Sequence, residues 1–291
     1  MPPPTKEDLW RSGKDETVEV NQRALIDKIL ARYSGEHTIF RELLQNADDA
    51  SAQHVQVRFY SQAGIAAMER GEPGALPDLK KDAASLFLFG WDIELTIDQQ
   101  MYRYVVTNDG VPFRQQDWHR LKKIAEGNPD EEKIGAFGVG FYSLWSVCDD
   151  PFVESGDKWM GFYWKDGKDQ LLARSGDLPP TSSSSIATPT LTGNPWTTFT
   201  MALRSPTPLE GPLDFARFLI TSLTFMKTIR KIDMLVDGVT VLQVEKSITG
   251  KKRVGVKGLR DESGAGMMKV QGVEETGMRI TAKVMNWLSG G

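Results

Sequence analysis

One segment constrains the fold of this chain more than any other. Residues 39–50, IFRELLQNADDA, place three polar side chains on one stripe of a helix: Glu42, Asn46 and Asp49. Small and apolar residues beside this stripe give the helix a flank for a core: Leu43, Ala47 and Ala50. A metal and a reacting water could meet on the polar stripe, although such a stripe alone is more often a solvated helix face.

Glycines dominate a second segment, KIGAFGVGFYS at residues 133–143, through Gly135, Gly138 and Gly140. They remove side chains where the backbone must turn tightly and approach an anion such as phosphate. A lone glycine run is a weak signal, because it is also typical of a turn. NDGVP at residues 108–112 is likewise typical of a turn after a strand. These segments indicate a function only when they are considered together and in their order along the chain.

Hydrophobic periodicity predicts both helices and strands. We expect helices over residues 21–33, over the first segment above, and over residues 215–229. We expect strands over residues 54–60, 102–110, 159–164 and 196–203, a hairpin turning at Asp237 and Gly238, and further short strands at 254–259, 267–273 and 278–285.

Composition excludes several classes of protein. The net charge of −4 and pI near 5.6 give no general attraction to nucleic acid. The three histidines have no zinc-type spacing and the chain has one cysteine, so any metal should be bound by oxygen. No apolar run is long enough to span a membrane, and the first residues do not form a signal peptide. We expect an intracellular protein, cytoplasmic or nuclear.

Taken together, the motifs resemble the GHKL ATPase superfamily, and most closely its branch containing the ninety-kilodalton heat-shock chaperone and sacsin. RELLQNADDA is similar to that branch's N-box, KIGAFGVGFYS to its glycine box, and NDGVPFRQQDWHRLKKIA to the corresponding sacsin stretch. The resemblance covers roughly residues 20–205. A parallel Rossmann fold is less suitable, since the expected order of strand, GxGxxG and helix is missing.

The resemblance implies a fold and a division of the chain. The fold would be an α/β two-layer sandwich, with a mixed, mainly antiparallel sheet covered by helices on one face: the Bergerat ATP-binding fold. Residues 1–250 would form the nucleotide-binding domain, with a lid at about 112–134 and an insertion at about 61–92. Residues 251–291 would be a C-terminal extension or the start of a further domain.

The resemblance also implies roles for single residues. Glu42 would be the general base, with Arg41 beside it holding it in a resting state, and Asn46 would hold Mg²⁺. Asp49 would lie at the nucleotide's edge, although a capping role is nearly as plausible. The phosphates would be lined by the glycine box and its neighbours: Gly135, Phe137, Gly138, Val139, Gly140 and Phe141.

Two neighbouring residues are candidates for the adenine contact. The family pattern Asp-x-Gly-x-Gly reads here Asn108, Asp109, Gly110, Val111, Pro112. Asn108 and Asp109 are both candidates, and we favour Asp109 because a carboxylate only accepts hydrogen bonds. Thr197 resembles the family's strand threonine that joins the adenine aspartate's water network, although a threonine is also ordinary in a strand.

The implied function is ATP binding with slow Mg²⁺-dependent hydrolysis, acting as a conformational switch in a chaperone-like protein. Its partners would be ATP or ADP, a protein client and a transient homodimer, without nucleic acid or membrane. The alternative is a scaffold module that binds ATP or ADP without hydrolysis. A DNA-repair ATPase is less consistent with the acidic composition.

Overall fold

The computed structural model describes residues 21–31, 35, 37–72, 97–123, 140–165, 169–179, 194–209, 212–254 and 274–284. The helices are α2 (Gln22–Leu30), α3 (Thr38–Asp49), α4 (Gln62–Glu69), α5 (Gln115–Leu121), the 3-10 helix η1 (Gly140–Ser146) and α6 (Pro212–Phe225). The strands are β1 (His54–Tyr60), β2 (Ile97–Asn108), β3 (Phe152–Gly156), β4 (Lys158–Trp164), β5 (Leu171–Asp177), β6 (Asn194–Leu209), β7 (Lys231–Val236), β8 (Val239–Arg253) and β9 (Glu274–Val284).

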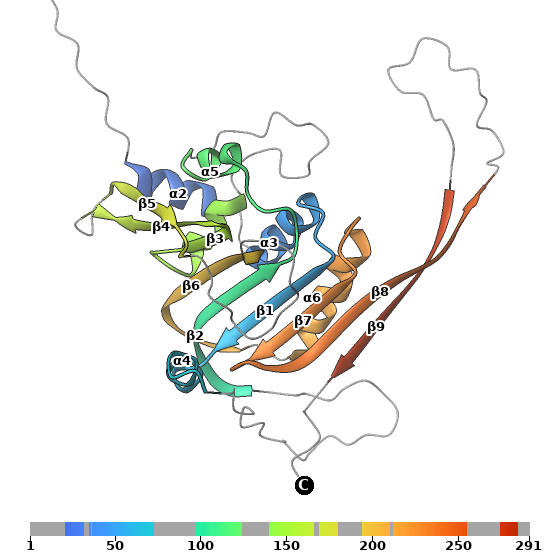
Figure 1. The fold of residues 1–291 in the computed structure, drawn as a ribbon. Helices are drawn as coiled ribbons and strands as arrows, with labels where there is room; N and C mark the ends of the chain where they lie inside the picture. Colours follow the sequence, from blue (N-terminus) through green and yellow to red (C-terminus); the bar gives the residue numbers. More distant parts are fainter. Residues whose placement is uncertain are drawn as a thin grey trace, which may run out of the picture.

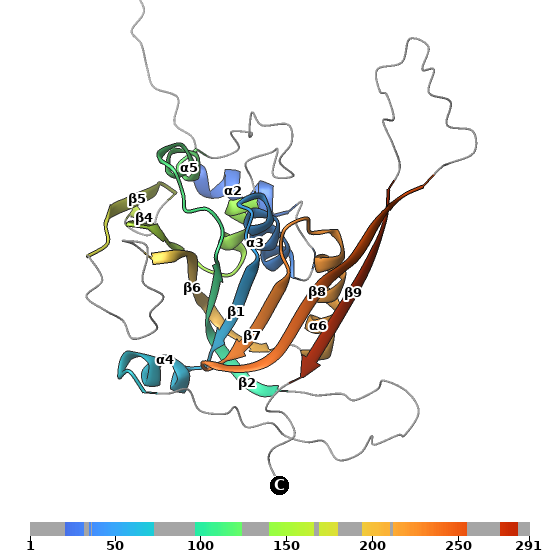
Figure 2. The same ribbon diagram turned by 45° about the vertical axis from the view of Figure 1, so that its right-hand side comes forward.

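The strands form one nine-stranded sheet in the order β5-β4-β3-β6-β2-β1-β7-β8-β9. Among the described strands, β1 and β7 form the parallel pair, and the other neighbours are antiparallel. Helices α3 and α6 lie on the same face of this sheet (Figures 1 and 2). The expected fold class, a mixed and mainly antiparallel sheet with helices, is confirmed.

The core lies between β1 and the helices. Val55, Val57 and Phe59 are buried while the residues between them are partly exposed, as the alternation in HVQVRFY predicts. Leu43, Leu44 and Ala47 of α3 and Leu219 and Leu223 of α6 belong to the same cluster. This packing fixes the rotation of α3 about its axis, so its polar stripe must point away from the core.

Several expected elements are confirmed, including the strand expected at 278–285, which corresponds to β9. Asp237 and Gly238 have φ of 48° and 85° and join β7 to β8, as the hairpin prediction requires. The expected domain boundary at residue 250 falls inside β8, and β9 continues the sheet. The expected insertion begins with helix α4, whereas most of the rest of it lies outside the described residues. So do the short strands expected at 254–259 and 267–273.

Within the described part of the chain, none of the helices is both long and apolar enough to cross a membrane.

Candidate functional site

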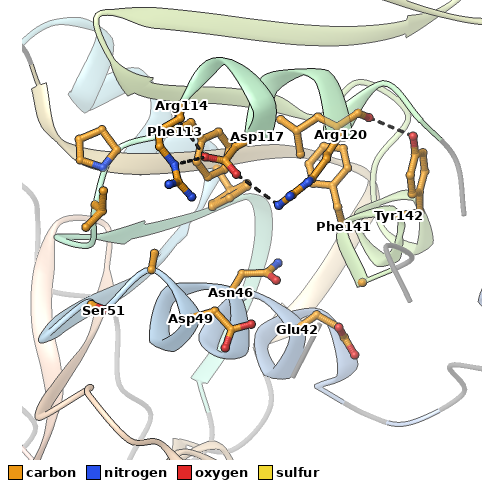
Figure 3. Close-up of a pocket in the computed structure, with 16 residues that line it drawn as sticks. Glu42, Asn46, Asp49, Ser51, Phe113, Arg114, Asp117, Arg120, Phe141 and Tyr142 are labelled. Atoms are coloured by element: carbon orange, nitrogen blue, oxygen red, sulfur yellow. Dashed lines mark hydrogen bonds and ion pairs between the residues drawn. The ribbon is translucent and has the colours of Figure 1, made fainter. Parts of the chain in front are cut away.

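A cavity of about 340 Å³ opens beside the polar stripe of α3. Its lining comes from α3 and the residues just after it, from residues 111–121, from the start of η1 and from Phe199 of β6. Glu42, Asn46 and Asp49 all contribute to one wall (Figure 3). The structure therefore brings together the three side chains that the helical spacing placed on one stripe.

The C-terminal end of α3 is fixed by Asp48, a residue that our sequence reasoning passed over. Its side chain accepts hydrogen bonds from the backbone N–H groups of Lys227, Thr228 and Ile229, at 2.7–3.1 Å, and from the Thr228 hydroxyl at 2.7 Å. Burial alone would raise the pKa of Asp48, but these hydrogen bonds together lower it. The signal was available, because Asp48 is four residues after Leu44 and so lies on the buried face.

Glu42 is a partly buried carboxylate at the junction of α3 and η1. Burial raises the pKa of Glu42 above its ordinary value of 4.5, and the positive charge of Arg41 opposes that shift. Arg41 is exposed, and its guanidinium lies 6.0 Å from the ring centroid of Phe218, outside the pocket lining. Arg41 therefore influences Glu42 electrostatically rather than by lining the pocket.

Gly140 packs directly against the Glu42 carboxylate. A Cβ atom at this position would lie 2.2 Å from Glu42 Oε2, so only glycine leaves the carboxylate where it is. Phe141, next in the chain, also lines the pocket. Both residues belong to the 3-10 helix η1, which runs from Gly140 to Ser146. Gly135, Phe137, Gly138 and Val139 lie outside the described residues, so their roles stay predictions.

The wall opposite α3 is formed by α5, the first part of the expected lid. Phe113 packs edge-on against Trp118, and its backbone N–H donates to Ser155 Oγ at 2.8 Å. Tyr142 Oη donates to the carbonyl of Leu121 at 3.0 Å, which joins the end of α5 to η1. The described part of the expected lid is therefore held against the body of the domain at both ends.

Three charged residues of this wall were not among the predicted site residues. Arg114, Asp117 and Arg120 line the pocket, and Asp117 forms ion pairs with both arginines (Figure 3). Their spacing of three residues is the signal that could have found them, since it places all three close together on a helix.

The NDGVP turn lies at the end of the pocket near Ala50, where Val111 N donates to the Ala50 carbonyl at 2.8 Å. Asp109 Oδ1 accepts hydrogen bonds from Gln53 N and His54 N, both at 2.8 Å, so this carboxylate holds the start of β1. Asp109 is not part of the pocket lining, and neither are Asn108, Gly110 or Thr197. Both hydrogen bonds end on Oδ1, so one of the two acceptor atoms of Asp109 is used by the backbone, and its contact with adenine stays a prediction.

Asn108 and Thr197 lie side by side on neighbouring strands. They face each other in the β2–β6 ladder and are almost fully buried. Thr197 Oγ1 is 2.7 Å from Ser155 Oγ, and Asn108 Oδ1 accepts from Gly110 N at 3.1 Å. The structure thus brings together Asn108 and Thr197, which were both predicted to lie near the adenine, and places Ser155 in contact with Thr197.

The donor set suits a nucleotide with an oxygen-bound metal. Carboxylate and amide oxygens are the protein ligands that Mg²⁺ accepts alongside phosphates and water. They lie on α3, whereas cationic guanidinium groups, which suit phosphate oxygens, lie on the opposite wall. The bare backbone of Gly140 leaves room for the Glu42 carboxylate in this wall. The residues present therefore fit Mg²⁺ and a polyphosphate.

Comparison with known proteins gives one family model and several relatives. The model of a protein of unknown function (DUF3684) matches residues 223–290, which include β7, β8 and β9. Human sacsin is 29% identical over 133 residues, which is 45% of this chain and 2% of sacsin.

Two further relatives match about half of the chain. The endoplasmin homolog of Dictyostelium discoideum is 30% identical over 151 residues, 50% of this chain and 19% of that protein. The chaperone protein HtpG of Alcanivorax borkumensis is 32% identical over 125 residues, 42% of this chain and 19% of that protein. The matches thus span less than a fifth of each relative's length. This chain is related to the GHKL ATPases of the sacsin and ninety-kilodalton heat-shock type.

Proposed function

We propose that this chain is a chaperone-like ATP-binding domain that hydrolyses ATP slowly with Mg²⁺ and changes conformation with its nucleotide state. The observation that carries the proposal is that Glu42 and Asn46 face one cavity, with Gly140 packed against the Glu42 carboxylate. Similarity to the endoplasmin homolog and to HtpG supports the same conclusion. Client binding and transient self-association follow from the resemblance, as further parts of the proposal.

Asn46 is the residue that would hold Mg²⁺, through its amide oxygen. The ion would supply charge neutralisation at the phosphates. Glu42 would accept a proton from the water that attacks the terminal phosphorus, while the bond to the bridging oxygen breaks and ADP leaves. A raised pKa makes Glu42 a stronger base than an exposed glutamate, provided that it is ionised.

The base end of the nucleotide would be set by Asn108 together with Thr197 and Ser155. The backbone hydrogen bonds that Asp109 accepts favour Asn108 over Asp109 for this role. Replacing Asn108 by alanine should weaken nucleotide binding in calorimetry. Loss of binding in Asp109→Ala with a normal melting temperature would return the role to Asp109.

The decisive experiment compares Glu42→Ala with Gln45→Ala. Gln45 lies on the same helix and is also partly buried, but it is not part of the pocket lining. Glu42→Ala should retain ATP binding by calorimetry and lose phosphate release, whereas Gln45→Ala should retain both. Phosphate release by Glu42→Ala at the wild-type rate would show that Glu42 is not the base.

The same measurements test the alternative function, a module that binds ATP or ADP without hydrolysis. If wild-type protein gains melting temperature with ATP or ADP but releases no phosphate, even at high protein concentration, it is a nucleotide-binding scaffold rather than an ATPase. If neither nucleotide changes the melting temperature or gives a calorimetric signal, the proposal fails altogether.

A further inference from the structure

Two arginines of the α5 segment line the pocket opposite the acidic stripe of α3. Arg114 precedes α5 and Arg120 lies near its end, and both are part of the pocket lining. Asp117 lies between them: its Oδ2 is 3.5 Å from Arg114 Nε, and its Oδ1 is 3.5 Å from Arg120 Nη1. The helix thus presents two cations that share one anion.

Both ion pairs are weak. Each N–O distance of 3.5 Å is longer than the 2.7–2.9 Å of a strong charge-assisted hydrogen bond. The side chains of Arg120 and Arg114 are 37% and 67% exposed, so water screens both pairs. A ligand with greater negative charge than one carboxylate would therefore replace Asp117 at little cost.

The two walls of the pocket carry complementary groups. The α3 wall offers the carboxylates of Glu42 and Asp49 and the amide of Asn46, which suit a metal cation. The α5 wall offers guanidinium groups, whose planar donors suit phosphate oxygens in pairs. A polyphosphate bound to a divalent cation carries both charges, so its metal side fits α3 and its outer oxygens fit α5.

Arg120 is better placed than Arg114 to meet the phosphates. In Figure 3 its guanidinium lies above Asn46 and beside Phe141, whereas Arg114 lies nearer the Ser51 end of the pocket. Arg120 is also the less exposed of the two, so its charge is less screened. Tyr142, which binds the backbone at the adjacent Leu121, holds this end of α5 in place.

We propose that Arg120 is the phosphate-binding residue of this pocket, and that Asp117 holds its guanidinium until a polyphosphate takes Asp117's place. The inference rests on the proposed nucleotide site and adds to it one phosphate-binding cation, the guanidinium of Arg120 on α5. Its ligand class is a nucleoside di- or triphosphate, whose phosphates Arg120 would contact.

The test is calorimetry of Arg120→Gln with ADP, AMP and adenosine in the presence of Mg²⁺, with Arg114→Gln as the matched control. Because a hydrogen bond to a charged group is lost, Arg120→Gln should weaken ADP binding about ten- to hundredfold. Its affinity for adenosine should stay within about twofold of wild type, since adenosine has no phosphate. Arg114→Gln should weaken ADP binding much less than Arg120→Gln.

Two further variants separate charge from structure. Arg120→Lys keeps the charge and should recover part of the lost ADP affinity. Asp117→Asn retains an oxygen acceptor for the Arg114 backbone N–H but removes the competing charge, so it should tighten ADP binding. Melting temperatures of all four variants would show that each is folded.

The outcomes distinguish this inference from the proposed function. If wild-type protein binds ADP and Arg120→Gln binds it equally well, Arg120 is not the phosphate contact and only the inference fails. Equal losses for ADP and adenosine would assign Arg120 a structural role and also overturn it. If wild-type protein binds neither, the nucleotide site itself is refuted.

Discussion

Replacing Gly140 by alanine should disable the site without unfolding the domain. The new Cβ atom would lie 2.2 Å from Glu42 Oε2 and 3.2 Å from its Cδ. The carboxylate oxygen must therefore retreat by about 1.2 Å to reach an ordinary contact of 3.4 Å. A misplacement of about 1 Å at a reacting group costs roughly a hundredfold in rate, or about 2.7 kcal/mol of transition-state stabilisation.

The stability effect should be small, because two contributions oppose each other. Gly→Ala at a position that alanine can adopt stabilises by about 0.4–1 kcal/mol through the unfolded state. Turning Glu42 away from a preferred rotamer costs about 0.5–1.5 kcal/mol. The melting temperature should therefore change by no more than a few degrees.

Gly64→Ala is the matched control, because it directs a new Cβ at a carboxylate that cannot retreat. That atom would lie 1.8 Å from Asp237 Oδ1, which accepts from Ser61 N at 2.8 Å, while Asp237 Oδ2 accepts from Ser61 Oγ at 2.7 Å. Breaking these buried hydrogen bonds should cost about 2–4 kcal/mol. Thermal unfolding, calorimetry with ATP and phosphate release would be measured on both variants.

The expected pattern is retained binding, lost phosphate release and a normal melting temperature for Gly140→Ala, against a lowered melting temperature for Gly64→Ala. Wild-type phosphate release by Gly140→Ala would refute the contact between Gly140 and the reacting carboxylate. A large loss of stability in Gly140→Ala would show that Glu42 is as rigidly held as Asp237.

Three further predictions concern charges inside the domain. The pKa of Glu42 is raised above 4.5, so phosphate release should fall as pH drops through that pKa, which a pH–rate profile would check. The stability of wild-type protein relative to Glu42→Gln should fall as pH rises through the same pKa, which unfolding midpoints would check. Asp48→Ala should cost about 3 kcal/mol in urea unfolding at neutral pH. The part of this stability that depends on the ionised carboxylate is lost in wild-type protein below 3.8, as pH falls through the lowered pKa of Asp48. Lys246→Met should cost about 1–2 kcal/mol in the same assay. The buried ammonium donates to the carbonyls of Leu223 and Met226 at the end of α6, and these hydrogen bonds would be lost. Removing a buried charge offsets part of that loss.

Local patterns in the sequence were sufficient for the elements nearest the site. The helical spacing of Glu42, Asn46 and Asp49 predicted that they share a wall, because the side-chain period of a helix does not depend on distant residues. The alternation of HVQVRFY likewise predicted β1, and Asp237 with Gly238 predicted the hairpin.

Contacts between distant residues could not be predicted in this way. Asp109 looked like a free acceptor, but the backbone of Gln53 and His54 uses its carboxylate, and no pattern within NDGVP records that contact. Asp48 was not among the predicted residues, because its backbone partners lie 179 to 181 residues later in the chain. Arg120 was not predicted either, because its place in the pocket depends on α5 lying opposite α3.

The parallel pairing of β1 with β7 also determines when the pocket can be complete during protein synthesis. His54 pairs with Lys231 and Asp48 binds residues 227–229, so the first wall of the pocket needs a segment made much later. At a typical rate of 5–20 residues per second, a ribosome needs roughly 10–35 seconds to add those residues. During that interval one edge of β1 has no strand beside it, and its apolar residues Val55, Val57 and Phe59 lack part of their covering. A domain related to chaperones would itself pass through a state that chaperones protect.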